Sequence, residues 1–203
     1  METETCLGRG QIECVDSSQP NFSYERYDGS IHQIDVPEVD RKNIFHLIFT
    51  TLLDSGKGVL GALDDISAVG HRVVHGGSFF SESEVITPPV ELAIQKCIPL
   101  APLHNPYNLQ GIRVCRELLP TVPHVAVFDT AFHQTMPDYT YVYPLPYRLH
   151  QEYGIRRYGF HGISHRYVSK RAAEIMETPL DTLKLISCHL GNGCSVTAID
   201  GCK

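Results

Sequence analysis

The chain has 203 residues, of which 42% are hydrophobic and 20% are charged, so it resembles an ordinary globular protein with a buried core. Its net charge of −6 argues against nucleic-acid binding, which needs clustered positive charge, but not against a small anionic substrate held by local arginines. No apolar run approaches the ~20 residues of a membrane span, and the acidic start is unlike a secretory signal. We therefore expect a cytoplasmic protein, of one large or two small domains, that binds neither membranes nor nucleic acid.

The N-terminal segment predicts a β-hairpin followed by a helix. An Asp-Gly pair at 28–29 is a strong hairpin turn, and it joins residues 22–26 to residues 31–36. Asp40 is expected to cap a helix whose apolar positions between 44 and 52 share one face.

The middle of the chain alternates strands and helices. Residues 66–69 predict a short buried strand that runs into the polar segment 71–77. Helices are predicted over 89–97 and 106–119. The apolar run 125–128 is typical of a central parallel strand.

The last third begins with residues 136–153, which are crowded with proline and tyrosine and predict an ordered crossover between domains. A helix over 164–176 and a strand over 184–189 follow. A glycine-rich turn at 191–193 then leads into a return strand over 195–199. Strands that alternate with helices in this way predict an α/β fold.

Several polar residues stand where such a fold binds ligands. Arg72 follows a buried strand and precedes paired glycines, which suits a carboxylate or phosphate site, although a surface turn explains it equally well. His104 precedes a helix N-terminus, where anions are favoured, although Asn105 acting as the helix cap accounts for the same pattern. Asp129 ends a strand and is a candidate catalytic group or a simple cap.

Two further segments admit alternatives of their own. The turn at 191–193 exposes backbone N–H groups that can cradle phosphate, or it is an ordinary hairpin turn. His161 lies between glycines and can donate a hydrogen bond to a phosphoryl oxygen. A zinc hydrolase site is the rival interpretation, although no H-E-x-x-H motif supports it; its ligands would be His71, His75, His161 and His165.

Taken in order, the segments H-R-V-V-H-G-G, A-P-L-H-N-P, F-D-T-A-F-H, R-R-Y-G-F-H-G-x-S-H and C-H-L-G-N-G resemble the hallmark segments of acetate kinases. The resemblance is specific over about 66–203 and looser before it. It implies an actin-like ATPase fold of ribonuclease-H-like domains, with an incomplete N-terminal domain over 1–135 and the crossover and start of the second domain over 136–203. It also implies a homodimer in the complete family.

The resemblance further implies phosphoryl transfer between ATP and acetate, giving acetyl phosphate and ADP, with Mg²⁺ bound by segments outside this chain. The roles that it assigns are catalysis to Asp129 and His161, substrate binding to Arg72, Val74, Leu103, His104 and Phe160, and ATP binding to His189, Leu190, Gly191, Asn192 and Gly193. Acetate is already ionised at pH 7, so a general base would have little to remove. We therefore expect Asp129 to orient an arginine or a metal-bound water.

The same resemblance implies that the chain lacks both ends of the complete enzyme. The missing parts are the opening N-x-G-S-S-S-x-K strand and the whole back half, with its second substrate arginine and adenosine pocket. Loss of a central strand exposes unpaired backbone groups, so we expect the isolated chain to be poorly stable and inactive. Two alternatives stay open: a propionate or butyrate kinase of the same family, and a non-catalytic partner of a full-length kinase.

Overall fold

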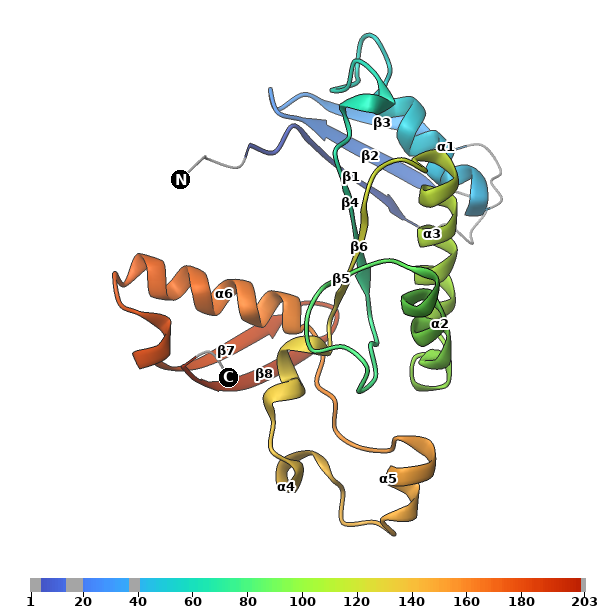
Figure 1. Ribbon diagram of the computed structural model, residues 1–203. Coiled ribbons are helices and arrows are strands. Elements are labelled where there is room, and N and C mark those ends of the chain that lie inside the picture. The colour runs from blue at the N-terminus through green and yellow to red at the C-terminus, as the bar shows by residue number, and fades with distance from the viewer. Residues whose placement is uncertain (1–4, 14–19, 37–40, 202–203) are drawn as a thin grey trace. The chain divides into compact units, whose positions relative to one another are not determined.

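The structure is a computed structural model that describes residues 5–13, 20–36 and 41–201 as a mixture of helices and strands (Figure 1). The chain divides into two compact units, Met1–Val69 with Gln110–Val122 and Gly70–Leu109 with Pro123–Lys203. The domain border expected near residue 135 stays a prediction. Within the described part of the chain, no helix is both long and apolar enough to cross a bilayer.

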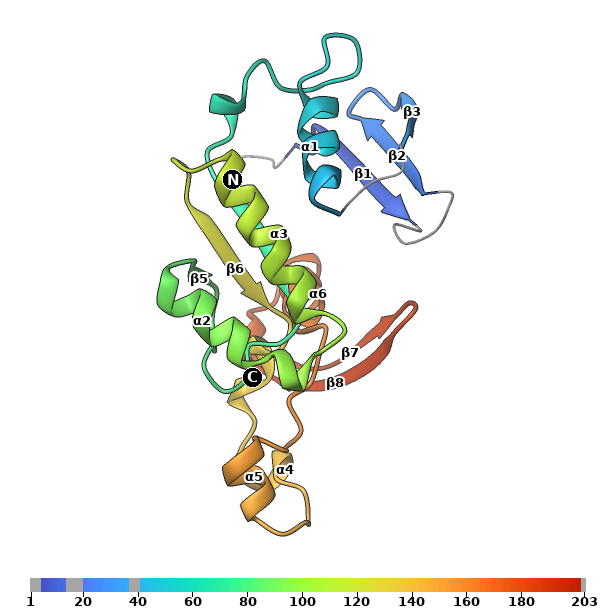
Figure 2. The same ribbon diagram turned by 90° about the vertical axis from the view of Figure 1, so that its right-hand side faces the viewer.

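The first unit contains a three-stranded antiparallel sheet (Figure 2). Its strands, in spatial order, are β1 (Gly8–Glu13), β2 (Asn21–Arg26) and β3 (Ile31–Asp35). The predicted hairpin is confirmed: Gly29 adopts a φ of +81°, which favours glycine, and the Ser30 N–H donates to Asp28 Oδ1 at 3.0 Å.

Two helices pack together in this unit. The predicted amphipathic helix is α1 (Arg41–Leu52), and it meets the later part of α3 (Asn105–Leu118). At Gly111 a side chain would lie 3.0 Å from the ring of Phe45, so glycine permits the close approach of the two helices. Asp40, the predicted cap of α1, lies outside the described residues. The buried apolar residues of the unit include Phe22, Tyr24, Ile44, Ile112, Cys115 and Leu119.

The second unit is built on a short sheet with the order β4-β6-β5. Its strands are β4 (Val69–Val73), β5 (Glu84–Val85) and β6 (His124–Phe128). The Asp129 N–H donates to the Val73 carbonyl at 3.0 Å, which joins the C-terminal ends of β4 and β6, so the two strands run in the same direction. The predicted parallel strand at 125–128 is confirmed.

The strand predicted at 66–69 was misplaced. The Ile66 N–H donates to the Leu63 carbonyl at 3.0 Å and closes a 3₁₀ turn, and the strand begins only at Val69. Strand β4 therefore includes His71 and Arg72, and the strand was not predicted there because these two residues are polar. On this strand, at the edge of its sheet, exposed and covered positions alternate, so polar side chains are tolerated.

Four further elements of the second unit lie within about two residues of their predicted bounds: α2 (Pro88–Lys96), α6 (Gly162–Ile175), β7 (Lys184–Leu190) and β8 (Cys194–Asp200). The short helices α4 (Asp138–Tyr141) and α5 (Arg148–Tyr153) were not predicted, because the sequence indicated an ordered loop over 136–153. Helix α6 packs against the antiparallel hairpin of β7 and β8 (Figure 1).

The hairpin of β7 and β8 has an inner and an outer face, because alternate residues of a strand point to opposite sides. Ser187 on the inner face is buried against α6, whereas Ile186 is 76% exposed. The outer face also carries the exposed free thiols of Cys188 and Cys194.

Asn105 does not act as the predicted helix cap. Helix α3 begins at Asn105 itself, and the fully buried side chain serves other segments. Its Oδ1 accepts the His75 N–H at 3.1 Å, and its Nδ2 donates to the carbonyls of His75 at 2.9 Å and Ile94 at 3.2 Å. The amide thus holds the chain after β4 to the end of α2.

Replacing Asn105 with alanine is expected to lower the free energy of unfolding by about 3 kcal/mol, because it leaves the buried backbone N–H and carbonyl of His75 without these partners and removes one of the hydrogen bonds to the Ile94 carbonyl. Urea unfolding of the chain measures the change. Gln95→Ala, which truncates an exposed amide on α2, is the matched control and should stay within about 0.5 kcal/mol of the parent. Equal losses in the two variants would contradict the assigned role.

Candidate active site

The second unit contains a cavity of about 770 Å³ that gathers most of the predicted site residues. The residues that line it are Arg72, Val74, Leu100, Ala101, Pro102, Leu103, His104, Asp129, Phe160, His161, Asn192 and Gly193. Three predicted ATP contacts, His189, Leu190 and Gly191, are not among its lining residues as the structure describes them. Leu190 is 75% exposed on the outer face of the hairpin. The roles assigned to all of these residues stay predictions.

An ion pair between Arg72 and Asp129 forms the polar end of the cavity. The Arg72 Nε donates to Asp129 Oδ1 at 3.2 Å, and Nη2 donates to Oδ2 at 2.5 Å. The Asp129 side chain is only 2% exposed, whereas that of Arg72 is 60% exposed. The guanidinium has five N–H groups, and since Asp129 takes two of them, the others are available to an anion in the cavity.

Two backbone hydrogen bonds of Asp129 and one side-chain hydrogen bond of Thr130 hold this loop in place. The Asp129 N–H bonds to Val73, as described above, and the Asp129 carbonyl accepts the Gly162 N–H at 2.9 Å. The next residue, Thr130, accepts the Gly76 N–H on its hydroxyl at 3.0 Å. A side chain at Gly162 would lie only 2.4 Å from the Asp129 carbonyl oxygen, so the start of α6 is packed directly on this loop.

The apolar wall of the cavity is graded in exposure. Val74 is buried, Phe160 is 39% exposed and Leu103 is 76% exposed. His104 is also exposed, one residue before α3. Arg72 and this wall together suit a small carboxylate with a short apolar tail, because the charge and the hydrocarbon each meet a matching surface.

His161 precedes α6 with a left-handed backbone, at a φ of +55°. A residue other than glycine in this conformation is uncommon and is enriched at functional sites. Burial lowers the pKa of its imidazole, and the nearby His189, whose ring stacks on it at 4.1 Å, acts in the same direction. A neutral imidazole at pH 7 follows, with one N–H to donate.

The sequence did not single out Ser195, whose side chain contacts His161. Ser195 Oγ lies 3.0 Å from His161 Nδ1 and 2.7 Å from His165 Nε2. The sequence could have indicated Ser195, because a hairpin with a three-residue turn at 191–193 pairs His189 with Ser195, as the structure does. His165 had been considered only as a zinc ligand.

The zinc alternative receives no support. Among residues 5–13, 20–36 and 41–201, no group of three or more His, Cys, Asp or Glu side chains is placed to hold a metal ion. His71 Nε2 instead lies 2.9 Å from His124 Nδ1, and His161 and His165 both contact Ser195.

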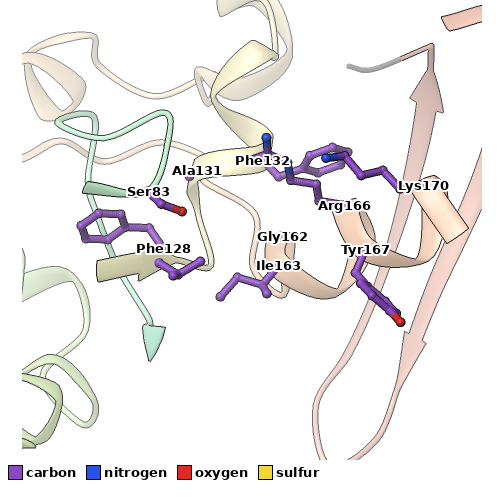
Figure 3. Close-up of a pocket in the computed structure, with 10 residues that line it drawn as sticks. Ser83, Phe128, Ala131, Phe132, Gly162, Ile163, Arg166, Tyr167 and Lys170 are labelled. Carbon is purple, nitrogen blue, oxygen red and sulfur yellow. The ribbon is translucent and has the colours of Figure 1, made fainter. Parts of the chain in front are cut away.

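A smaller cavity of about 200 Å³ lies on another side of the Asp129 loop, between that loop and α6 (Figure 3). Phe128 and Ile163 contribute to its apolar lining, and Arg166 and Lys170 of α6 contribute its cations. None of the predicted site residues lines this smaller cavity.

Comparison with known proteins assigns the chain to one family. Residues 1–203 match the acetokinase family. The chain is 52% identical over 203 residues to the acetate kinase of Halothermothrix orenii and 56% identical over 203 residues to that of Thermoanaerobacter pseudethanolicus. Each alignment covers 100% of this chain and 51% of the relative.

Solved structures agree. The crystal structure of Porphyromonas gingivalis acetate kinase matches with a TM-score of 0.90 and 43% identity, over 97% of this chain and 49% of that one. A propionate kinase from Francisella tularensis matches with a TM-score of 0.86 and 41% identity, over 96% and 49%. The fold is the α/β, actin-like ATPase fold that the sequence predicted.

The chain belongs to the acetokinase family. It spans about half the length of the curated relatives that it matches.

His75 supports the cavity from behind. It is 2% exposed, accepts the Gly77 N–H on Nδ1 at 2.9 Å and lies edge-on to Tyr158 and Phe160, with ring centroids 4.4 and 5.6 Å away. Burial lowers its pKa to about 4, and the positive charge of Arg156 adds to the effect.

We expect the His75 imidazole to stay neutral until the pH falls to about 4, whereas an ordinary histidine titrates near 6.5. The unfolded chain therefore binds one more proton than the folded chain between these values, so His75 makes stability fall as the pH drops from 6.5 toward 4. Histidine NMR titration reads the pKa directly.

Unfolding at several pH values checks the linkage. His75→Asn keeps an acceptor for the Gly77 N–H and should reduce the pH slope of the unfolding free energy by one proton, about 1.4 kcal/mol per pH unit. A His75 signal that titrates near 6.5 would be inconsistent with the assigned burial.

Proposed function

We propose that this chain supplies the acetate-binding side of a site that transfers a phosphoryl group between ATP and acetate, giving acetyl phosphate and ADP. The observation that carries the proposal is the cavity in which Arg72 and Asp129 stand at one end, Val74 and Phe160 form a wall, and His161 lies beside them. Family membership supports it independently. The relatives are about twice as long as this chain, so the complete activity is proposed for the whole protein.

Acetate is positioned by charge at one end and by its methyl group at the other. In this proposal, Arg72 binds the carboxylate with the N–H groups that Asp129 leaves available. Val74, Leu103 and Phe160 receive the methyl group, with His104 at the edge of the same cavity. Phosphoryl transfer depends mainly on positioning and on electrostatic stabilisation, which is what these residues offer.

Asp129 is proposed to orient Arg72 and not to act as a base. Its carboxylate is buried and both of its oxygens accept from the guanidinium, which fixes the plane of that group. Acetate has no proton to give at pH 7, so a base would have no task in this step.

The phosphoryl group is proposed to lie near His161 and the glycine turn. A neutral imidazole N–H can offset charge on an equatorial oxygen. Asn192 and Gly193 line the same cavity, and the proposal extends the ATP-binding segment to His189, Leu190 and Gly191.

The residues present fit phosphate better than they fit Mg²⁺. The cavity lining contains one carboxylate, that of Asp129, and Arg72 already holds it. Mg²⁺ prefers several oxygen ligands and commonly arrives bound to substrate phosphates. We therefore propose no Mg²⁺ ligand in this chain. A cytoplasmic, homodimeric complete enzyme is part of the same proposal.

The acyl chain preferred by the site is a second question. The similar propionate kinase structure and the 76% exposure of Leu103 favour a wall that could admit a longer tail. Comparison of acetate, propionate and butyrate binding would separate the alternatives.

Acetate is expected to perturb the NMR signals of cavity residues in the purified chain, and Arg72→Ala should weaken its affinity at least ten-fold, because a charge-assisted bidentate contact is lost. Arg171→Ala, at an exposed arginine paired with Glu174 on α6, is the matched control. Unchanged affinity in Arg72→Ala would exclude the proposed carboxylate site.

A hydroxamate assay with acetate, ATP and Mg²⁺ measures turnover by the same sample. We expect none from these 203 residues alone. Formation of acetyl phosphate that disappears in Arg72→Ala would mean that the residues in hand suffice for the reaction.

Asp129→Asn should also weaken acetate binding, by about ten-fold, because the amide Nδ2 would face a donor and Arg72 would no longer be held. If Asp129 acts through Arg72, the effects of Asp129→Asn and Arg72→Lys will not add, and their coupling should exceed about 1 kcal/mol. A double-mutant cycle of acetate affinities measures it. Additive effects would mean that Asp129 does not act through Arg72.

A further inference from the structure

A line of hydrogen bonds runs from the cavity into the interior of the second unit through His161. It connects Ser187 Oγ to His165 Nδ1 at 2.9 Å, His165 Nε2 to Ser195 Oγ at 2.7 Å, and Ser195 Oγ to His161 Nδ1 at 3.0 Å. The line therefore alternates hydroxyl and imidazole groups and ends at the candidate catalytic histidine.

The fold brings these four side chains together. His161 stands immediately before α6, and its carbonyl accepts the His165 N–H at 3.0 Å, so the two residues are joined across the first turn of the helix. Both imidazoles contact Ser195. Ser187 of β7 and Ser195 of β8 occupy the inner face of the hairpin that packs against this helix (Figure 1).

The middle of this line of hydrogen bonds is buried away from solvent. His165 is 0% exposed and Ser187 is 6% exposed. Burial and the neighbouring His133, His189 and His161 lower the pKa of His165, so it is neutral at pH 7. A neutral imidazole donates from one nitrogen and accepts at the other. When both contacts are hydrogen bonds, neutral His165 therefore donates to one of the two serines and accepts from the other.

Two directions run unbroken through the whole line. In each of them the single hydroxyl proton of Ser195 goes to one of its two imidazole partners, and its oxygen accepts from the other. In the outward direction, Ser187 donates to His165, His165 Nε2–H donates to Ser195, and Ser195 donates to His161 Nδ1. In the inward direction every bond is reversed.

The two directions present different groups to the cavity. A side chain built at Gly193, which lines the cavity, would lie 3.3 Å from His161 Nε2, so this nitrogen is on the cavity side of the ring. The outward direction protonates Nε2 and offers a donor to an anion. The inward direction leaves a lone pair on Nε2, which would repel a phosphoryl oxygen.

We propose that Ser195 and His165 are positioning residues that hold His161 as its Nε2–H tautomer, so that it donates to a phosphoryl oxygen in the cavity. The identity of that ligand rests on the proposed function. The tautomer does not rest on it alone, because the outward direction is also the one in which the buried hydroxyl of Ser187 donates its proton to its contact, His165 Nδ1.

Nitrogen NMR of the chain labelled with ¹⁵N-histidine tests the assignment directly, since protonated and unprotonated ring nitrogens have well-separated shifts. We expect His161 and His165 each to carry the proton on Nε2 at pH 7. A proton on Nδ1 of either residue in the parent chain would overturn the proposal without any variant.

Variants distinguish positioning from simple packing. Ser195→Ala should convert His161 from one tautomer to a mixture, and Ser195→Thr, which keeps the hydroxyl, should restore the single Nε2–H form. Ser164→Ala is the matched control, because its hydroxyl contacts His189 Nδ1 at 3.0 Å and lies outside the line. A single Nε2–H tautomer that persists in folded Ser195→Ala would refute the role of Ser195.

Titration with inorganic phosphate separates this proposal from the proposed function. If both hold, Ser195→Ala should weaken phosphate binding about five-fold, the effect of one hydrogen bond. A parent chain that has the Nε2–H tautomer but responds to neither acetate nor phosphate would count against the function and still support the positioning role. Acetate binding by a chain in which His161 carries its proton on Nδ1 would support the proposed function and contradict the positioning role.

Discussion

The ion pair between Arg72 and Asp129 joins the ends of two neighbouring strands and lines the cavity in which we propose that acetate binds. A carboxylate as buried as that of Asp129 is stable only when it is paired and hydrogen-bonded. The pairing arginine is thereby held in one orientation while most of its side chain stays open to a ligand. Helix α6 packs on the same loop through Gly162, and His161, just before this helix, lines the same cavity.

Burial also determines the protonation state of two histidines in the second unit. Burial keeps His75 and His165 neutral. His165 uses both ring nitrogens in contacts with serines, and His75 accepts the Gly77 N–H on Nδ1. An imidazole in water could change tautomer freely. Enclosed between serines, His165 cannot do so without reversing its neighbours, which makes the interior of the unit part of the site.

Local pattern was enough to predict the strand 125–128, the hairpin turn at 28–29 and the main helices, because each is set by periodicity or by a turn residue. The family resemblance, not the pattern, gathered Arg72 and Asp129 into one site. Features that depend on long-range contacts were missed. Asn105 was expected to cap its own helix, whereas tertiary structure uses its amide to hold the chain after β4. Ser195 was overlooked because its role exists only once β8 packs on α6.

The two faces of the β7–β8 hairpin also offer an experimental opportunity. Cys188 precedes His189, and Cys194 precedes Ser195, but both thiols point to the outer face and are exposed and free. A fluorescent or spin label attached at either thiol would sit one strand thickness from the histidines without touching them. The hairpin therefore provides natural reporter positions from which the occupancy of the cavity could be followed in solution.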